Sequence, residues 1–138
     1  MEGDFALEET PDGRHVVVSR EVPASREDAW DLLTDTERWP EWGPTVAAVE
    51  SPTRRIEAGT AGRVEVRPLG VRVPFEISRF DEAGRRWHWA VARLPATGHH
   101  VAPTGEGCRV EFEIPLAAGG YAPVCRRACR NIRRLAEA

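Results

Sequence analysis

The carboxyl-terminal segment, residues 118–137, is the feature that most constrains the fold. On a helix, where successive residues turn by about 100°, its apolar side chains share one arc: Tyr121, Val124, Cys125, Ala128, Cys129, Ile132 and Leu135. The opposite arc is basic: Arg126, Arg127, Arg130, Arg133 and Arg134. Pro123 fits only in a first turn, so the helix is predicted to begin between residues 119 and 122. Such a helix needs a second apolar layer to cover its stripe.

A set of short strands is the only large candidate for that layer. Seven segments are predicted as strands because they are rich in β-branched and aromatic residues and are bounded by Gly or Pro: RHVVVSREV, TVAAVES, GRVEVRP, VRVPFEISRF, RRWHWAVARL, TGHHVAP and CRVEFEIPL. Short connections indicate antiparallel pairing. In the last segment, Cys108, Val110, Phe112, Ile114 and Leu116 alternate with Arg109, Glu111 and Glu113. This alternation predicts a sheet with one apolar and one polar face.

Two short helices are predicted between the first strand and the others. In SREDAWDLLTD, Ser25 is a typical N-cap, and one face collects Ala29, Trp30, Leu32 and Leu33. A second capping pattern, Thr34 with Glu37, predicts another helix, which Pro40 should end near Trp39. Residues 1–13 are expected to form an acidic tail, and residues 14–138 a single domain.

Composition limits the classes of function. The 138 residues are 41% hydrophobic and 30% charged, which is typical of a soluble globular domain. No apolar run approaches the length of a membrane span, and the acidic amino end does not resemble a signal peptide, so a cytoplasmic location is expected. The net charge of −3 argues against nucleic-acid binding. Three cysteines, Cys108, Cys125 and Cys129, show no disulfide framework and are expected to be reduced thiols.

The segment VPASREDAWDLLTDTERWPEWGPTVAAVE, followed by RVEFEIPL and the terminal helix, carries a family resemblance. It resembles the polyketide cyclase/dehydrase-like branch of the START-related helix-grip superfamily, also called SRPBCC or Bet v 1-like, over residues 14–137. The pattern consists of Ala24, Trp30, Leu33, Asp35, Trp39, Trp42 and Pro44. The resemblance implies an α+β helix-grip fold in which a curved, seven-stranded antiparallel sheet wraps around the long terminal helix and leaves an apolar cavity. Members include aromatic polyketide cyclases, lipid and hormone carriers, and proteins that bind other proteins, so the fold leaves the activity open.

The tryptophans are the first candidates for binding a ligand. Trp39 and Trp42 either fasten the short helices to the sheet or line a cavity, and one side chain can do both. Trp87 and Trp89 share strand parity and should face the apolar side together, with His88 toward solvent. The expected lining is Trp42, Phe75, Arg79, Trp87, Trp89, Val101, Phe112, Tyr121, Val124 and Ala128. The alternative is that the aromatic side chains fill the interior without any ligand.

His99 and Arg20 are the candidate catalytic residues. His99 shares parity with Val101 and should face inward, either as a general base or as a structural histidine bonded to a backbone carbonyl. Arg20 and Arg79 interrupt apolar strand faces, so each either meets a ligand or reaches outward from a strand end. For Arg79, a bulge that turns Phe80 inward is an equal alternative. Cys125 and Cys129 have helical spacing but lie on the apolar arc, so no metal or cofactor is expected.

Together these residues suggest a monomer or homodimer that binds a hydrophobic small molecule, aromatic or polyketide-like. One hypothesis is a cyclase, in which His99 removes a proton, Arg20 stabilises an enolate oxygen, and the tryptophans confine the chain. The alternative hypothesis is a non-catalytic carrier or sensor, or a module that binds a protein partner.

Overall fold

The computed structural model describes residues 4–11 and 13–137, and within them eight strands form one antiparallel sheet. Their order is β1-β2-β8-β7-β6-β5-β4-β3. The strands are β1 (Asp4–Thr10), β2 (Gly13–Val22), β3 (Val46–Glu50), β4 (Ala61–Val66), β5 (Val71–Asp81), β6 (Arg86–Val91), β7 (Leu94–Pro103) and β8 (Cys108–Pro115). The helices are α1 (Arg26–Thr34), α2 (Trp39–Trp42) and α3 (Ala122–Glu137), and a 3₁₀ segment, η1 (Leu116–Tyr121), precedes α3. The α+β helix-grip class is therefore confirmed.

The predicted count of seven strands is wrong, because β1 lies inside the segment expected to be an acidic tail. It pairs with β2 along its whole length, from Asp4 opposite Ser19 to Thr10 opposite Gly13. Gly13 has a φ of 112°, a conformation that glycine adopts without the strain of a Cβ atom. The two strands therefore form a tight hairpin at one edge of the sheet.

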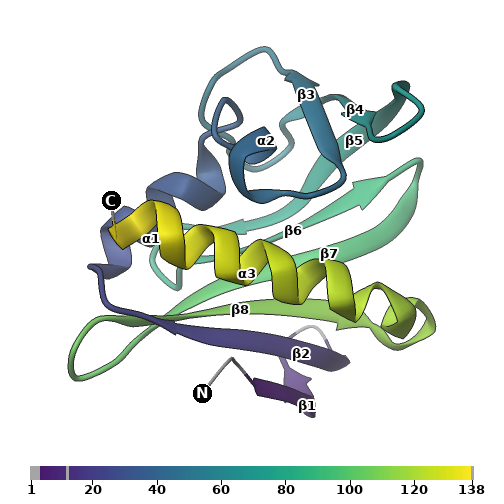
Figure 1. The fold of residues 1–138 in the computed structure, drawn as a ribbon. Coiled ribbons are helices and arrows are strands. Elements are labelled where there is room, and N and C mark those ends of the chain that lie inside the picture. The colour runs from purple at the N-terminus through teal and green to yellow at the C-terminus, as the bar shows by residue number, and fades with distance from the viewer. Residues whose placement is uncertain (1–3, 12, 138) are drawn as a thin grey trace.

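Helix α3 crosses the concave face of the sheet, as Figure 1 shows. It begins at Ala122, with Pro123 in its first turn, as predicted. Its buried side chains are Ala122, Cys125, Ala128, Cys129 and Ile132. Leu116, predicted to face inward, is instead about half exposed, because β8 ends at Pro115. No helix in the described ranges is long and apolar enough to cross a bilayer.

Helices α1 and α2 are joined through tryptophan side chains. The Ser25 hydroxyl caps α1 by accepting a hydrogen bond from the Asp28 amide, at 3.0 Å. The second helix differs from its prediction: Pro40 lies in its first turn instead of ending it, since the fixed φ of proline suits a helix start. The indole N–H groups of Trp39 and Trp42 donate to the carbonyls of Leu33 and Leu32, at 2.9 and 2.7 Å. They satisfy carbonyls in the last turn of α1 that lack a helical partner.

The convex face of the sheet contains a buried polar cluster that the alternation in β8 does not predict. Glu113, expected in solvent, is only 2% exposed and contacts Arg86 and the Nε2 atom of His88, the latter at 2.9 Å. His88, also expected in solvent, lies over Gly98, where a Cβ atom would come within 2.4 Å of its ring. Burial alone would raise the pKa of Glu113, but hydrogen bonds from His88 and Arg86 outweigh it and lower this pKa to about 2. The polar face is thus partly core.

We expect Glu113→Gln to lower the free energy of unfolding by about 3 kcal/mol at pH 7, because it leaves the mostly buried guanidinium of Arg86 without its counter-charge. The pKa of the folded state lies below the ordinary value of 4.5, so the carboxylate stabilises the fold above pH 4.5 and this contribution is lost as the pH falls toward 2. Urea unfolding at pH 7 and pH 3 should therefore show a smaller deficit at pH 3. Glu76→Gln, at an exposed position of β5, is the control. Equal deficits at both pH values would contradict this account.

Candidate functional site

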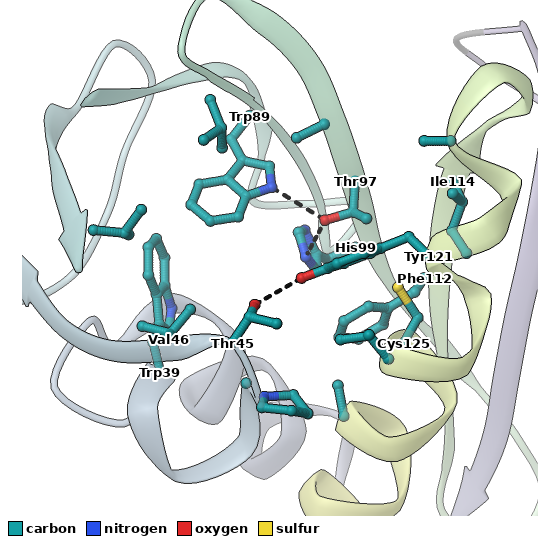
Figure 2. A pocket seen from close by; sticks show the side chains of 18 of the residues that line it. Trp39, Thr45, Val46, Trp89, Thr97, His99, Phe112, Ile114, Tyr121 and Cys125 are labelled. Carbon is teal, nitrogen blue, oxygen red and sulfur yellow. Dashed lines mark hydrogen bonds between the residues drawn. The ribbon is translucent and has the colours of Figure 1, made fainter. Parts of the chain in front are cut away.

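A partly open cavity of about 400 Å³ lies between α3 and the concave face of the sheet. Figure 2 shows it from close by, with the helix on one side and the strands on the other. Its aromatic lining consists of Trp39, Trp42, Trp87, Trp89, Phe112 and Tyr121. Most of its remaining lining is aliphatic and includes Val46, Val64, Val66, Val91, Ile114, Val124 and Ala128. The volume falls in the range of small-molecule sites, about 300 to 1,000 Å³.

The cavity exists because α3 places small side chains opposite the sheet. Val124, Cys125 and Ala128 line it, while the larger Ile132 is fully buried farther along the helix. Small side chains do not reach the valine and tryptophan side chains of β4 and β6, so the space between the two layers stays open. The same apolar stripe that fastens α3 to the sheet therefore also shapes the hollow.

One wall of the cavity is a continuous aromatic stack. The rings of Trp39 and Trp87 are nearly parallel, with centroids 5.4 Å apart, and His99 stacks on Trp87 with its ring centroid at 3.9 Å. Phe112 meets His99 edge-on at 4.7 Å. Because the nitrogen atoms of Trp39 and Trp42 are bonded to α1, these side chains are both structural and part of the lining. The wall is held in place before any ligand arrives.

Polar atoms meet the cavity at two positions. The Thr97 hydroxyl accepts a hydrogen bond from Trp89 Nε1 and forms another with His99 Nε2, each at 3.1 Å. The hydroxyls of Thr45 and Tyr121 are 2.7 Å apart, and this hydrogen bond joins the segment before β3 to the end of η1, directly before α3 (Figure 2). Burial raises the pKa of Tyr121, so its hydroxyl keeps its proton at neutral pH. Each position presents neutral groups that donate or accept hydrogen bonds.

His99 is neutral in this environment. Its side chain is 1% exposed, and burial, followed by the nearby His88, lowers its pKa to about 3. A general base works best when its pKa lies near the operating pH, so a histidine with this pKa is a weak one. Its position instead suits a hydrogen-bonding group in the wall of a binding site.

Eight of the predicted site residues line the cavity: Trp42, Trp87, Trp89, His99, Phe112, Tyr121, Val124 and Ala128. Arg20, Phe75, Arg79 and Val101 do not. Phe75 does face inward, but it packs against Trp39 and Trp89, with centroids 5.6 and 5.8 Å away, so those indoles separate it from the hollow.

Local geometry explains the other differences. A register shift between Ile77 and Arg79 turns Phe80 inward against Trp30, with ring centroids 5.7 Å apart, which is the bulge considered from the sequence. Arg20 points toward α3 but lines a separate hollow. Val101 is fully buried, and its carbonyl accepts a hydrogen bond from Arg26 Nε at 2.8 Å. Thr97 was missed, although its strand parity with His99 could have identified it.

Among the described residues, neither the thiols of α3 nor the acidic groups of the convex face favour a metal ion. Burial raises the pKa of Cys125 to about 12 and also raises that of Cys129, so both thiols stay protonated. On the convex face, His100, Glu111 and Glu113 each offer a ligand atom, all within 4.8 Å. Arg86 and Arg109 pair with these two carboxylates and compensate the negative charge that would attract a cation.

The comparisons with known proteins agree with this geometry. The sequence profile of the family described as polyketide cyclase/dehydrase and lipid transport matches residues 13–137, so this chain belongs to that family. No curated protein matches it significantly. The chain is similar in structure to a protein from Mesorhizobium loti, with a TM-score of 0.70, 17% identity, and coverage of 88% of this chain and 96% of that one.

Two further structures extend the likeness. CalU16 from Micromonospora echinospora has a TM-score of 0.68 and 15% identity, with coverage of 98% of this chain and 84% of that one. A point mutant of norcoclaurine synthase from Thalictrum flavum, solved with a transition-state analogue, has a TM-score of 0.58 and 16% identity, with coverage of 96% of both chains. At these identities the likeness establishes the fold alone.

We predict that the His99 imidazole does not titrate between pH 8 and pH 5, because protonation would place a charge in an apolar interior. Long-range ¹H–¹⁵N spectra should show neutral imidazole nitrogens throughout this range, with the resonance assigned by its loss in His99→Gln. Since the folded-state pKa lies below the ordinary 6.5, this group also destabilises the fold as the pH falls from 6.5 toward 3. An imidazolium signal with a midpoint above pH 5 would contradict the prediction.

Proposed function

We propose that this protein binds a small apolar molecule with aromatic character in the cavity and holds it without chemical change. One observation carries the proposal: a hollow of about 400 Å³ is lined by aromatic and aliphatic side chains and has polar groups at only a few lining positions. Family membership supports a small hydrophobic ligand, because the family description includes lipid transport.

The lining suits a flat ligand that carries one or more polar atoms. Apolar surface removed from water contributes roughly 25 cal/mol per Å², so contact with the aromatic wall supplies most of the affinity. A ring lies against Trp89 or Trp42, and offset or edge-on contacts between aromatic rings add about 1 kcal/mol. A ligand hydroxyl or carbonyl then meets Thr97 or the Thr45–Tyr121 pair, which fixes its orientation.

Two observations favour binding over cyclisation. The proposed base, His99, has a pKa of about 3 and accepts a proton only weakly at neutral pH. The proposed enolate-stabilising residue, Arg20, does not line the cavity that contains His99. In the cyclase suggested by the sequence, the His99 imidazole and the Arg20 guanidinium must both contact the same substrate molecule. A carrier needs only the apolar cavity.

Ala128→Leu tests whether the cavity is the binding site. The larger side chain projects from α3 into the hollow, so the affinity for 1-naphthol should fall at least tenfold, while thermal stability stays the same or rises because empty space is filled. The fluorescence of the lining tryptophans measures the affinity. Ala136→Leu is the matched control, since Ala136 packs on the core from the same helix but does not line the cavity. Equal losses in both variants would argue against the site.

The proposal of binding without turnover has its own test. Native mass spectrometry of the protein loaded with 1-naphthol should give the same bound mass before and after prolonged incubation. The same measurement on protein as purified would show whether an apolar compound is retained from the expression host. A bound compound whose mass changes on the protein, but not in buffer, would overturn the non-catalytic part of the proposal.

Thr97→Val tests the polar contact separately from the apolar ones. Valine keeps the shape of threonine and removes the hydroxyl, so 1-naphthol should bind about fivefold more weakly, the equivalent of one hydrogen bond of about 1 kcal/mol. Naphthalene, which has the same rings and no hydroxyl, should bind unchanged. If both probes lost affinity equally, the hydroxyl would be supporting the wall and not contacting the ligand.

A further inference from the structure

A second hollow, of about 260 Å³, lies between α3 and β2. Its lining includes Arg20 and Val18 from the strand and Pro123, Arg126, Cys129 and Arg130 from the helix. Because each residue turns the helix by about 100°, Arg126 and Arg130 point roughly 100° to 160° away from Val124, Cys125 and Ala128, which line the apolar cavity, whereas Cys129 is buried beside Cys125 on the face that meets the sheet. The two hollows therefore lie on different flanks of one helix.

The second hollow concentrates positive charge. Three arginines from two elements line it, and none of the lining residues that the structure describes carries a carboxylate. In the described ranges, Arg126 and Arg130 form no ion pair with an acidic side chain, whereas Arg133 on the same helix pairs with Glu137 at 2.9 Å. Since the whole chain has a net charge of −3, this basic site is a local excess and not a general property of the surface.

Like charges at close range repel, and an anion between them turns that repulsion into attraction. The planar guanidinium fork matches the spacing of two oxygens on a phosphate or carboxylate, and arginine is the residue most used for such bidentate contacts. Arg126 and Arg130, which form no ion pair with an acidic side chain in the described ranges, together balance a doubly charged group better than a singly charged one. A phosphate group, with two negative charges and several oxygens, fits these requirements better than a carboxylate.

We propose that the hollow between β2 and α3 is a binding site for a phosphate-type oxyanion, with Arg20, Arg126 and Arg130 as its ligands. This site is separate from the apolar cavity and does not depend on the function proposed for it. Phe5 and Leu7 of β1 are paired with Val18 and Val16, so they face the same side of the sheet as Arg20, and they are 57% and 59% exposed. The phosphate therefore comes either as a free ion or on a molecule whose apolar part contacts these side chains.

The first experiment uses inorganic phosphate and pyrophosphate. Isothermal titration calorimetry and thermal unfolding, at constant ionic strength set with sodium chloride, should show binding and a rise in melting temperature beyond that in chloride alone. In Arg126→Gln/Arg130→Gln the affinity should fall at least tenfold and the phosphate-dependent rise should disappear. Arg127→Gln/Arg134→Gln is the matched control, with the same change of charge on the same helix at positions outside the hollow. It should keep the wild-type response.

Two outcomes would overturn the proposal. If both double variants lost the phosphate response equally, the effect would be general charge attraction to the helix and not a site. If the wild-type protein gave no response to either anion beyond that of chloride, the hollow would not bind phosphate. Because the measured quantity is the increment caused by the anion, a change in the intrinsic stability of a variant does not obscure the result.

A second experiment separates the two sources of phosphate. Sedimentation with vesicles of phosphatidylcholine, with or without phosphatidic acid, measures binding to a lipid headgroup. A lipid headgroup is the ligand if vesicle binding requires phosphatidic acid and is kept in the control variant. The same binding should then be lost in Arg126→Gln/Arg130→Gln and in Phe5→Ser/Leu7→Ser. Binding of the free anions without vesicle binding assigns it to a soluble phosphate. Ala128→Leu should respond to phosphate like wild type, so a failure of the cavity proposal would not be mistaken for a failure of this one.

Discussion

The packing of α3 against the concave face of the sheet is the contact on which the rest of the structure depends. The sheet exposes a row of apolar side chains on its concave face, and this helix packs over that face, against β2 and β8 (Figure 1). The contact is uneven along the helix. Near its C-terminal end Ile132 is fully buried, whereas near its start Val124 and Ala128 line open space. Close packing at one end holds the helix, so the other end can stand away from the sheet without loss of the fold.

An empty apolar hollow is unfavourable in itself, because the atoms that line it lose van der Waals partners on one side. In this protein rigid surroundings maintain it. The Trp39–Trp87–His99 stack forms a wall that does not collapse inward, and the Trp39 and Trp42 nitrogen atoms are bonded to the end of α1. The hydrogen bonds that complete a helix thus also prevent the hollow from closing. A ligand that restores the missing contacts gains binding energy without a large rearrangement.

The parts of the structure that sequence could predict are those set by local periodicity. The apolar stripe of α3 and the inward face of β8 follow from spacings within single segments, and both are observed. The residues of the site were harder to predict, because whether a side chain lines the cavity depends on its neighbours from other segments. Phe75 has the predicted orientation but is covered by Trp39 and Trp89. Glu113 lies on the predicted face but is buried by Arg86 and His88 from β6, a strand that is not even its direct neighbour. The acidic residues of β1 led to the prediction of a tail. The alternation of Phe5 and Leu7 is the feature of the sequence that could have indicated a strand.

Arg20 shows how the same limit affects a functional assignment. Strand parity indicates that the Arg20 side chain lies on the face of the sheet that α3 covers. Which flank of α3 this side chain reaches depends on where the helix crosses β2. Arg20 and Val18 both line the hollow that Arg126 and Arg130 border, and the Arg20 charge lies near Cys129. One helix therefore separates two chemically opposite environments. Substitutions at positions 124 and 128 act on the apolar side, and those at 126 and 130 act on the charged side, because residues two apart on a helix point in nearly opposite directions.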